Sequence, residues 1–228
     1  MVKYRGPRLK IIRRLGLLPG LTKKFPQLRL KTPGQHGKLV FNKITRTSLS
    51  DDYKDRLFEK QKLRFNYGIT EKQLVSYFND AKTRFGSTGS ILLELIESRL
   101  DCVIFRLGFA STIPAARQIV NHGHIVVNNI LVDIPSFLCM PGDIISIRNR
   151  KQSKNLITTN FKTQQNTRKV IQRRLKRSNL TESSSSSLLP THLSVDSKTL
   201  VAKYLSTVKR KDVLIRINEL KVVEYYSQ

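Results

Sequence analysis

The sequence has 228 residues, and its 42 lysines and arginines against 16 acidic residues give a net charge of +26 at pH 7. Because like charges oppose compaction, this excess implies an anionic partner, and nucleic acid is the usual one. No apolar run approaches the roughly 20 residues of a membrane-spanning helix, and residues 1–20 are too basic for a secretory signal. We therefore expect neither a membrane-spanning helix nor a secretory signal.

The two cysteines argue against a metal centre. Cys102 and Cys139 lie in apolar contexts, without a CxxC spacing or a paired histidine. That usage fits a reducing compartment and gives no zinc ligand set. We expect no metal and no cofactor.

The positive charge is concentrated in two arms. Residues 1–50 hold thirteen Lys and Arg and no acid, and residues 144–181 hold eleven and no acid. Residues 51–143 balance eleven basic against eleven acidic residues. Acid-free runs of this length predict nucleic-acid-binding arms on either side of a balanced body.

Residues 1–49 predict an extended basic arm. They show no sustained hydrophobic period and are interrupted by many glycines and prolines. Such a segment cannot bury enough apolar surface to fold alone, so we expect it to order against RNA. The turn PGQHG at 33–37 exposes backbone N–H groups, and its histidine suits a polar RNA contact better than a metal.

Residues 50–97 predict a helical domain. Acidic residues after Ser50 favour a helix start, and this helix should end at Tyr67, just before Gly68. Thr70 and Gln73 have the spacing of a capping box that opens a second helix over an apolar and aromatic stripe. A third helix, around residues 91–96, leads into the next domain.

Residues 98–155 predict a small domain of two helices and a hairpin. Apolar residues at helical spacing between 100 and 107 are followed by Gly108, and Thr112 with Pro114 begins a second helix that ends at 121–123. Strands at 124–127 and 130–134 flank Asn128-Asn129, a pair that tolerates positive φ, and another strand is expected at 144–147.

The remaining chain is expected to contain a linker and a docking segment. Residues 156–190 are basic and serine-rich, with a helix possible at 168–177, and the serine run 183–187 predicts a flexible linker or insertion. Residues 191–228 are expected to dock on the body, ending in one strand or short helix. The fold class is therefore α+β.

Enzyme motifs are absent from the sequence. It contains no P-loop, GxGxxG, HExxH or GxSxG pattern. The helices and hairpin of residues 98–148, about 50 residues, can present a rigid surface but leave no room for a deep pocket. Asp101, which follows Arg99-Leu100, has the context of an internal salt-bridge or capping acid. We expect no catalytic site.

Several motifs in order resemble one family, the fourth protein of the small ribosomal subunit (the S-four family) in its bacterial and plastid form. They are YRGP at 4–7, PGQHG at 33–37, EKQKLR at 59–64 with YGI at 67–69, SRLD at 98–101, RLGF at 106–109, ARQIVNHGHIVVN at 116–128 and EYYS at 224–227. The resemblance covers nearly the whole chain.

The resemblance implies a helical amino-terminal domain, a second RNA-binding domain and a carboxyl-terminal segment that packs back on the first. It implies a primary binder of small-subunit rRNA that acts early in assembly, with the fifth small-subunit protein as a neighbour at an interface tied to decoding accuracy. Zinc is not carried over, because the amino-terminal cysteines of some members are missing here. The opening resembles plastid-encoded members, so a chloroplast ribosome is expected, with a bacterial cytoplasm as the alternative. No homo-oligomer is expected.

RNA contacts are expected from basic, polar and aromatic side chains of both domains. The basic arm contributes Lys3, Tyr4, Arg5, Arg8, Lys10, Arg13, Arg14, Gln35 and His36; the helical domain contributes Lys60, Lys62, Arg64 and Tyr67; the second domain contributes Arg99, Arg106, Thr112, Arg117, Gln118, Asn121, His122 and His124. Replacing Arg106 or Arg117 is expected to weaken RNA binding with little loss of fold.

Two other classes compete with this interpretation. An RNA-modifying enzyme, such as a pseudouridine synthase, can carry the same small RNA-binding module, but it needs a catalytic block that this sequence does not contain. A DNA-binding regulator with a helix-turn-helix would need dimer symmetry, and the sequence shows no dimer seam. Co-sedimentation with small ribosomal subunits discriminates the ribosomal interpretation from both.

Overall fold

The chain folds into two compact units. The computed structural model describes residues 4, 6–24, 51–177, 189–196 and 199–227. The helical unit contains the described residues up to Leu92 and those from Ile215 onward, and the sheet unit spans Leu93–Leu214. The expected α+β class is confirmed.

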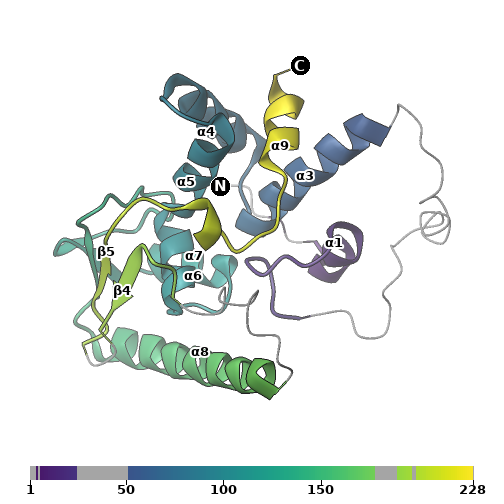
Figure 1. The fold of residues 1–228 in the computed structure, drawn as a ribbon. Coiled ribbons are helices and arrows are strands. Elements are labelled where there is room, and N and C mark those ends of the chain that lie inside the picture. Colours follow the sequence, from purple (N-terminus) through teal and green to yellow (C-terminus); the bar gives the residue numbers. More distant parts are fainter. Residues whose placement is uncertain (1–3, 5, 25–50, 178–188, 197–198, 228) are drawn as a thin grey trace. The chain divides into compact units, whose positions relative to one another are not determined.

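In the described residues, the helical unit is built from α-helices (Figure 1). They are α1 (Arg8–Leu15), α3 (Asp51–Tyr67), α4 (Glu71–Thr83), the first half of α5 (Thr88–Glu97) and α9 (Glu219–Tyr226). The capping box is confirmed, because the Thr70 hydroxyl accepts from the Gln73 N–H while the Gln73 side chain reaches back to the Thr70 backbone.

The carboxyl-terminal helix α9 packs against α3 and α4 within this unit. The rings of Tyr226 and Phe78 lie 5.1 Å apart, and the Tyr226 hydroxyl donates to Glu71 Oε1 at 2.8 Å. Burial, followed by the hydrogen bond to Glu71, raises the pKa of Tyr226, so the phenol keeps the proton that it donates. At the start of α9, the Asn218 N–H donates to Glu59 of α3 at 3.1 Å. Residues far apart in sequence therefore close this unit.

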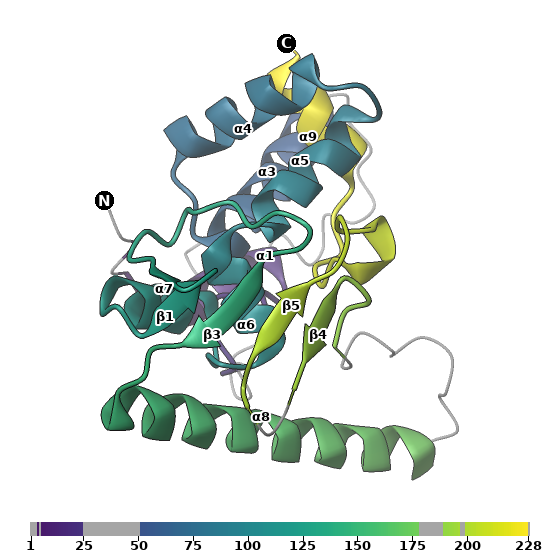
Figure 2. The same cartoon turned by 90° about the vertical axis from the view of Figure 1, so that its left-hand side faces the viewer.

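The sheet unit combines two short helices, a five-stranded antiparallel sheet and one long helix (Figure 2). Its elements are α6 (Leu100–Leu107), α7 (Ile113–Asn121), β1 (Ile125–Val127), β2 (Ile130–Leu131), β3 (Ile144–Ile147), α8 (Lys151–Arg177), β4 (Leu193–Val195), β5 (Ala202–Tyr204) and the 3-10 helix η3 (Arg210–Asp212). The strand order is β2-β1-β3-β5-β4.

Local signals in the sequence set the α6–α7 and hairpin geometry. Gly108 ends α6 in the left-handed region, at φ 89°. The Thr112 hydroxyl accepts from the Ala115 N–H at 3.3 Å and caps α7. Asn128 and Asn129 adopt φ values of 49° and 66° at the turn between β1 and β2. The three corresponding predictions are confirmed.

The core of the sheet unit lies between the sheet and its helices. Ile145 and Ala202 are fully buried on neighbouring strands, and α8 contributes Ile157 and Phe161, one helical turn apart. The Phe161 ring lies 5.9 Å from that of Phe109. Burying an isoleucine or phenylalanine side chain contributes about 1.5–3 kcal/mol, so Ile157 and Phe161 anchor α8 to the unit.

This anchoring overturns two predicted boundaries. The helix α8 continues from Lys151 to Arg177, so the expected linker at 156–190 is wrong over 156–177; the helix expected at 168–177 is the end of α8. Residues from 191 to Leu214 belong to the sheet unit, where they supply β4 and β5, instead of docking on the helical domain. The serine run 183–187 lies outside the described residues.

Candidate nucleic-acid interface

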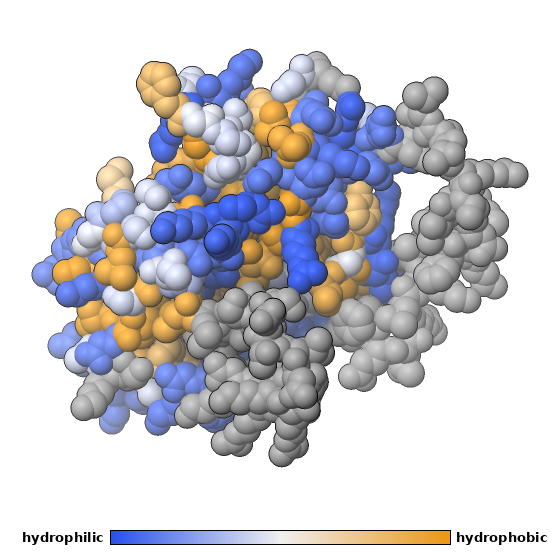
Figure 3. All heavy atoms as spheres, viewed as in Figure 1, coloured by the Kyte–Doolittle hydropathy of each residue, from blue (hydrophilic) through white to orange (hydrophobic). Residues whose placement is uncertain are grey.

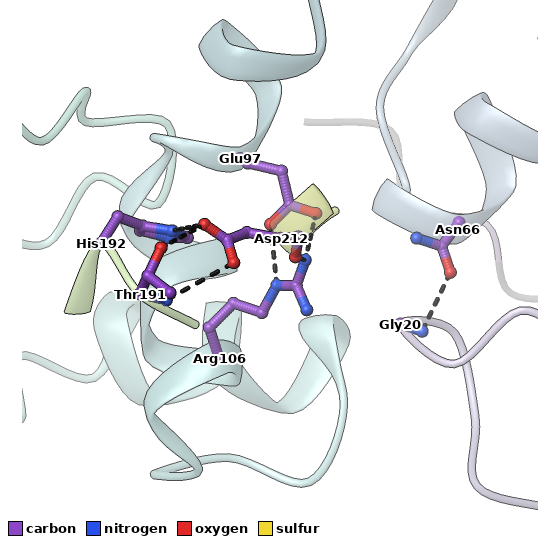
Figure 4. Close-up of polar contacts among 7 residues, drawn as sticks. All are labelled: Gly20, Asn66, Glu97, Arg106, Thr191, His192 and Asp212. Atoms are coloured by element: carbon purple, nitrogen blue, oxygen red, sulfur yellow. Dashed lines mark hydrogen bonds and ion pairs between the residues drawn. The ribbon is translucent and has the colours of Figure 1, made fainter. Parts of the chain in front are cut away.

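Helix α1 presents basic side chains on the surface of the helical unit. Its apolar side, with Ile11 and Ile12, is buried, while Arg8, Lys10 and Arg14 are exposed and Arg13 is half-buried. The turn after α1 is fixed to α3 because the Gly20 N–H donates to Asn66 Oδ1 at 2.9 Å (Figure 4). The cations of α1 are therefore carried by a docked helix.

Tyr4 lies beside α3 and remains accessible. Its ring is 48% exposed and makes an edge contact with Phe65, with ring centroids 5.5 Å apart. An exposed aromatic ring next to cations can stack on an unpaired base. Four other expected contacts of the amino-terminal arm, Lys3, Arg5, Gln35 and His36, lie outside the described residues.

Two of the α3 residues expected at the RNA surface lie inside the helical unit. Lys60 is 5% exposed, and its Nζ donates to Glu71 Oε1 at 2.9 Å and to the Tyr225 hydroxyl at 3.2 Å. Tyr67 is 2% exposed. Both expectations are wrong, because the ammonium is used to join α4 and α9 to α3 and the ring is packed in the core.

The two other α3 cations stay partly accessible. Lys62 pairs with Glu59 at 2.7 Å, and Arg64 lies against the Phe65 ring, 5.4 Å from its centroid. Both cations are only half-buried, so they can exchange these partners for phosphate. They stay candidates for RNA contact.

In the sheet unit, Asp101 gathers two of the expected RNA contacts. Arg99 is fully buried and donates to both carboxylate oxygens of Asp101, at 3.1 and 3.0 Å. Arg117, with 11% of its side chain exposed, donates to the same carboxylate at 2.7 Å. The expected role of Asp101 as an internal salt-bridge acid is confirmed. The expected RNA contact from Arg99 is wrong, because its side chain is fully buried and its guanidinium pairs with Asp101.

Arg106 is also internal. Its guanidinium makes two parallel hydrogen bonds to the Glu97 carboxylate, both at 2.9 Å, and donates to the Asp212 carbonyl (Figure 4). Both side chains of the pair are buried, at 7% and 2% exposure. The buried guanidinium is not available for the expected RNA contact. Because Arg106 ties η3 to α5 and α6, we now expect its replacement to destabilise the fold.

The second half of α7 keeps its polar groups at the surface. Gln118, Asn121 and His122 are exposed, and Thr112 is half-buried with its hydroxyl oxygen capping the helix. His124, just after α7, is half-buried; its Nδ1 lies 2.9 Å from the Ser153 hydroxyl of α8. Gln118, Asn121, His122 and His124 lie towards the end of α7, where His124 contacts the start of α8, whereas Thr112 lies at the opposite end of α7.

Cations that we did not single out in the sequence complete this surface. The Arg148 N–H donates to the His124 carbonyl at 2.9 Å. Three exposed cations follow: Arg150, Lys151 and Lys154. Burial lowers the pKa of His124, and the charges of His122, Arg148 and Arg150 lower it further. We define the basic cluster as His122, His124, Arg148, Arg150, Lys151 and Lys154. The signal in the sequence was the acid-free run from residue 144.

A buried histidine is expected to make the stability of the sheet unit depend on pH. His192 is fully buried, its Nδ1 lies 3.5 Å from Asp212 Oδ2, and its Nε2 has no hydrogen-bond partner among the described residues (Figure 4). Burial lowers the pKa of His192 below 6.5, although Asp212 opposes this shift.

We expect the free energy of unfolding to be greatest above pH 6.5 and to fall as the pH drops towards the lowered pKa of His192, because the unfolded chain then binds the proton first. Replacing His192 with glutamine should flatten this dependence. Urea unfolding of both proteins at pH 7.5 and 5.5 measures it. If the unchanged protein and the glutamine variant lose the same stability between pH 7.5 and 5.5, groups other than His192 cause the pH dependence.

The described residues show neither a membrane span nor a metal cluster. No helix among them is long and apolar enough to cross a membrane. No group of three or more His, Cys, Asp and Glu side chains gathers within the described ranges. Burial raises the pKa of Cys139 to about 12, so its thiol carries a proton at pH 7 and is a poor metal ligand.

Two family models match consecutive parts of the chain. Residues 3–97 match the family described as "Ribosomal protein S4/S9 N-terminal domain", and residues 98–145 match the "S4 domain". Proteins named "Small ribosomal subunit protein uS4" from Synechocystis and Cyanothece are 50% and 51% identical, over all of this chain and 99% of each relative. A protein named uS4c from Cyanophora paradoxa is 47% identical over the full length of both chains. The chain therefore belongs to the ribosomal S4 family.

Proposed function

We propose that this protein is a structural, non-enzymatic component of the small ribosomal subunit that binds the subunit's rRNA. The observation that carries the proposal is the basic cluster, because it places two histidines and four cations of the acid-free run on one surface of the sheet unit. Phosphate contacts need such donors, and the balanced charge of residues 51–143 leaves them to the cluster and the amino-terminal arm.

The RNA contacts that we propose are those that the described surface leaves accessible. They are Tyr4, Arg8, Lys10, Arg13 and Arg14 of the amino-terminal segment, Lys62 and Arg64 of α3, Gln118 and Asn121 of α7, and the basic cluster. Arg117 and Thr112 lie beside this surface and position α7. Lys3, Arg5, Gln35 and His36 stay predictions from the sequence.

Finer aspects of the role rest on the resemblance of the motifs. We propose that the protein binds early in subunit assembly, that it contacts the fifth small-subunit protein at an interface that influences decoding accuracy, and that it works in a plastid ribosome. Relatives from cyanobacteria and from Cyanophora paradoxa support a plastid or bacterial ribosome.

The function is tested with the full chain and purified rRNA of the small subunit. We expect specific binding, protection of a defined RNA region in a hydroxyl-radical footprint, and co-sedimentation with reconstituted small subunits. A DNA-binding regulator would bind duplex DNA at least as tightly and would leave the rRNA unprotected. Binding to rRNA without incorporation into subunits would instead favour an RNA-binding factor outside the ribosome.

A further inference from the structure

One stretch of this very basic chain lacks cations. Residues 118–147 contain no lysine or arginine, although the whole chain has 42, and the two charged residues within the stretch are Asp133 and Asp143. A phosphate backbone is bound chiefly through Lys and Arg. Beyond the two histidines of the basic cluster, this part of the sheet unit is therefore poorly suited to RNA.

The same stretch exposes an unusual number of apolar side chains. Sixteen large hydrophobic residues are exposed in the described parts of the chain, and six of them fall between residues 130 and 144. We call these six the apolar rim: Ile130 68%, Leu131 47%, Ile134 58%, Phe137 37%, Met140 68% and Ile144 43% exposed. In Figure 3, hydrophobic atoms reach the surface on the left, where the loops of the sheet unit lie in Figure 1. Grouped exposed apolar side chains mark an interaction surface.

The backbone holds the apolar rim in a fixed conformation. The loop between β2 and β3 is bonded to α6, because the Leu100 N–H donates to the Phe137 carbonyl at 2.8 Å. The Cys139 N–H donates to the Ser98 carbonyl at 2.8 Å, and the Gly142 N–H donates to the Tyr204 carbonyl at 2.7 Å. A loop fixed in this way loses little conformational entropy when a partner binds.

Within residues 118–147 the charged side chains beside the apolar rim are acidic, and cations from neighbouring segments reach it only at Leu131 and Ile144. Asp133 is exposed and makes no hydrogen bond or ion pair with the described residues, whereas Asp143 accepts from Asn128 Nδ2 at 2.9 Å. The cation nearest in register is Lys203 of β5, opposite Ile144 of β3. An unpaired carboxylate among apolar side chains fits a partner that brings a cation of its own.

The apolar rim also adjoins the basic cluster. Leu131 and the Arg148 guanidinium both approach Gly123, where an added Cβ would lie 3.7 Å from the leucine and 3.6 Å from the arginine. Two neighbouring surfaces of opposite chemistry therefore meet on one small domain. A single RNA ligand does not match both of them, because phosphate is repelled by Asp133 and cannot pair with apolar side chains.

We propose that the apolar rim docks a protein neighbour within the small subunit: a segment with exposed apolar side chains and a Lys or Arg that pairs with Asp133. This inference rests on the proposed ribosomal function, and it divides the sheet unit into an RNA-binding surface and a protein-binding surface. The apolar side chains supply the contact area, and the carboxylate selects a basic partner.

The first experiment asks whether the apolar rim faces RNA. The double variant Ile130→Lys/Met140→Lys and the single variant Asp133→Lys are each titrated with small-subunit rRNA alone. We expect Kd values within about twofold of the unchanged protein and the same salt slope, because added cations away from phosphate release no counterions. Tighter binding with a slope steeper by about 0.7–0.9 per added lysine would show that the rim faces RNA and would overturn the inference.

The second experiment asks whether a protein covers the apolar rim. Small subunits are reconstituted from rRNA, this protein carrying a photo-crosslinking amino acid at position 140, and the purified remaining small-subunit proteins. We expect one dominant cross-link, to a protein and not to RNA. Adding Asp133→Lys or Ile130→Lys should lower its yield at least about fivefold, the effect of losing a contact at the centre of an interface. Phe85→Lys, at a fully exposed position of the helical unit, is the matched control and should leave the yield unchanged.

The outcomes separate this inference from the proposed function. Cross-links to RNA, or cross-links to many proteins in small yield, would overturn the inference while rRNA binding stands. Failure of the unchanged protein to bind rRNA would instead overturn the proposed function. Thermal melts of the lysine variants should match the unchanged protein, because all the replaced side chains are exposed.

Discussion

Replacing Arg106 with alanine is expected to lower the free energy of unfolding of the sheet unit by about 3–5 kcal/mol. The substitution leaves the Glu97 carboxylate, 2% exposed, without the guanidinium that forms both of its 2.9 Å hydrogen bonds. Removing one member of a buried ion pair costs this much because the remaining charge stays desolvated. Urea unfolding followed by circular dichroism measures the loss.

A double variant supplies the control for this prediction. Replacing Arg106 and Glu97 together with leucines removes both charges, so most of the lost stability should return. The affinity of the folded fraction for rRNA should be unchanged in the single variant. If Arg106→Ala unfolds like the unchanged protein but binds rRNA more weakly, the prediction is contradicted and Arg106 contacts RNA.

Neutralising the basic cluster is expected to have the largest effect on RNA binding. In the triple variant Arg150→Gln/Lys151→Gln/Lys154→Gln, three exposed cations at the start of α8 are lost. Each phosphate contact contributes about 0.7–0.9 to the slope of log K against log salt, so the slope should flatten by about 2–3. At about 1 kcal/mol for each contact, affinity should fall roughly 10²-fold. A filter-binding titration at several salt concentrations measures both quantities.

The matched control removes the same charge from another surface of the same unit. Lys203, Lys209 and Lys211 are also exposed, and their replacement with glutamine changes the net charge equally. If the basic cluster acts through direct phosphate contacts, the control variant should retain most of the affinity for rRNA and most of the slope of log K against log salt. Equal losses in the two variants would show that RNA responds to the overall charge and that the basic cluster is not a specific interface.

Position along the chain could not distinguish surface cations from buried ones. Lys60 has the sequence context of an exposed helix residue, yet it is buried by Glu71 and by Tyr225, which is 165 positions away. Arg99 and Arg106 had the residue type that RNA contacts require, but nearby acids turn them inward. Conversely, the sequence identifies Arg150 and Lys151 only as part of a charge run, because the contact of the start of α8 with His124 depends on tertiary packing.

The sequence by itself determined the local elements and the class of partner. Gly108, the Thr112 cap and Asn128-Asn129 act within a few residues, so their effects on α6, α7 and the hairpin could be predicted from spacing alone. The net charge of +26 and the two acid-free runs likewise do not depend on the fold, because counterion release follows the number of cations.

Tertiary structure alone decided which of those cations remain available and where the elements of the second half belong. In the sequence, Ile157 and Phe161 are isolated apolar residues of a polar segment. In the structure both are buried, Phe161 against Phe109, and the segment predicted as a linker is part of the helix α8. The free energy of burying a charge or a ring is set by the groups that surround it, and those groups come from distant parts of the chain. Pairing and burial therefore had to be observed, because no local pattern encodes them.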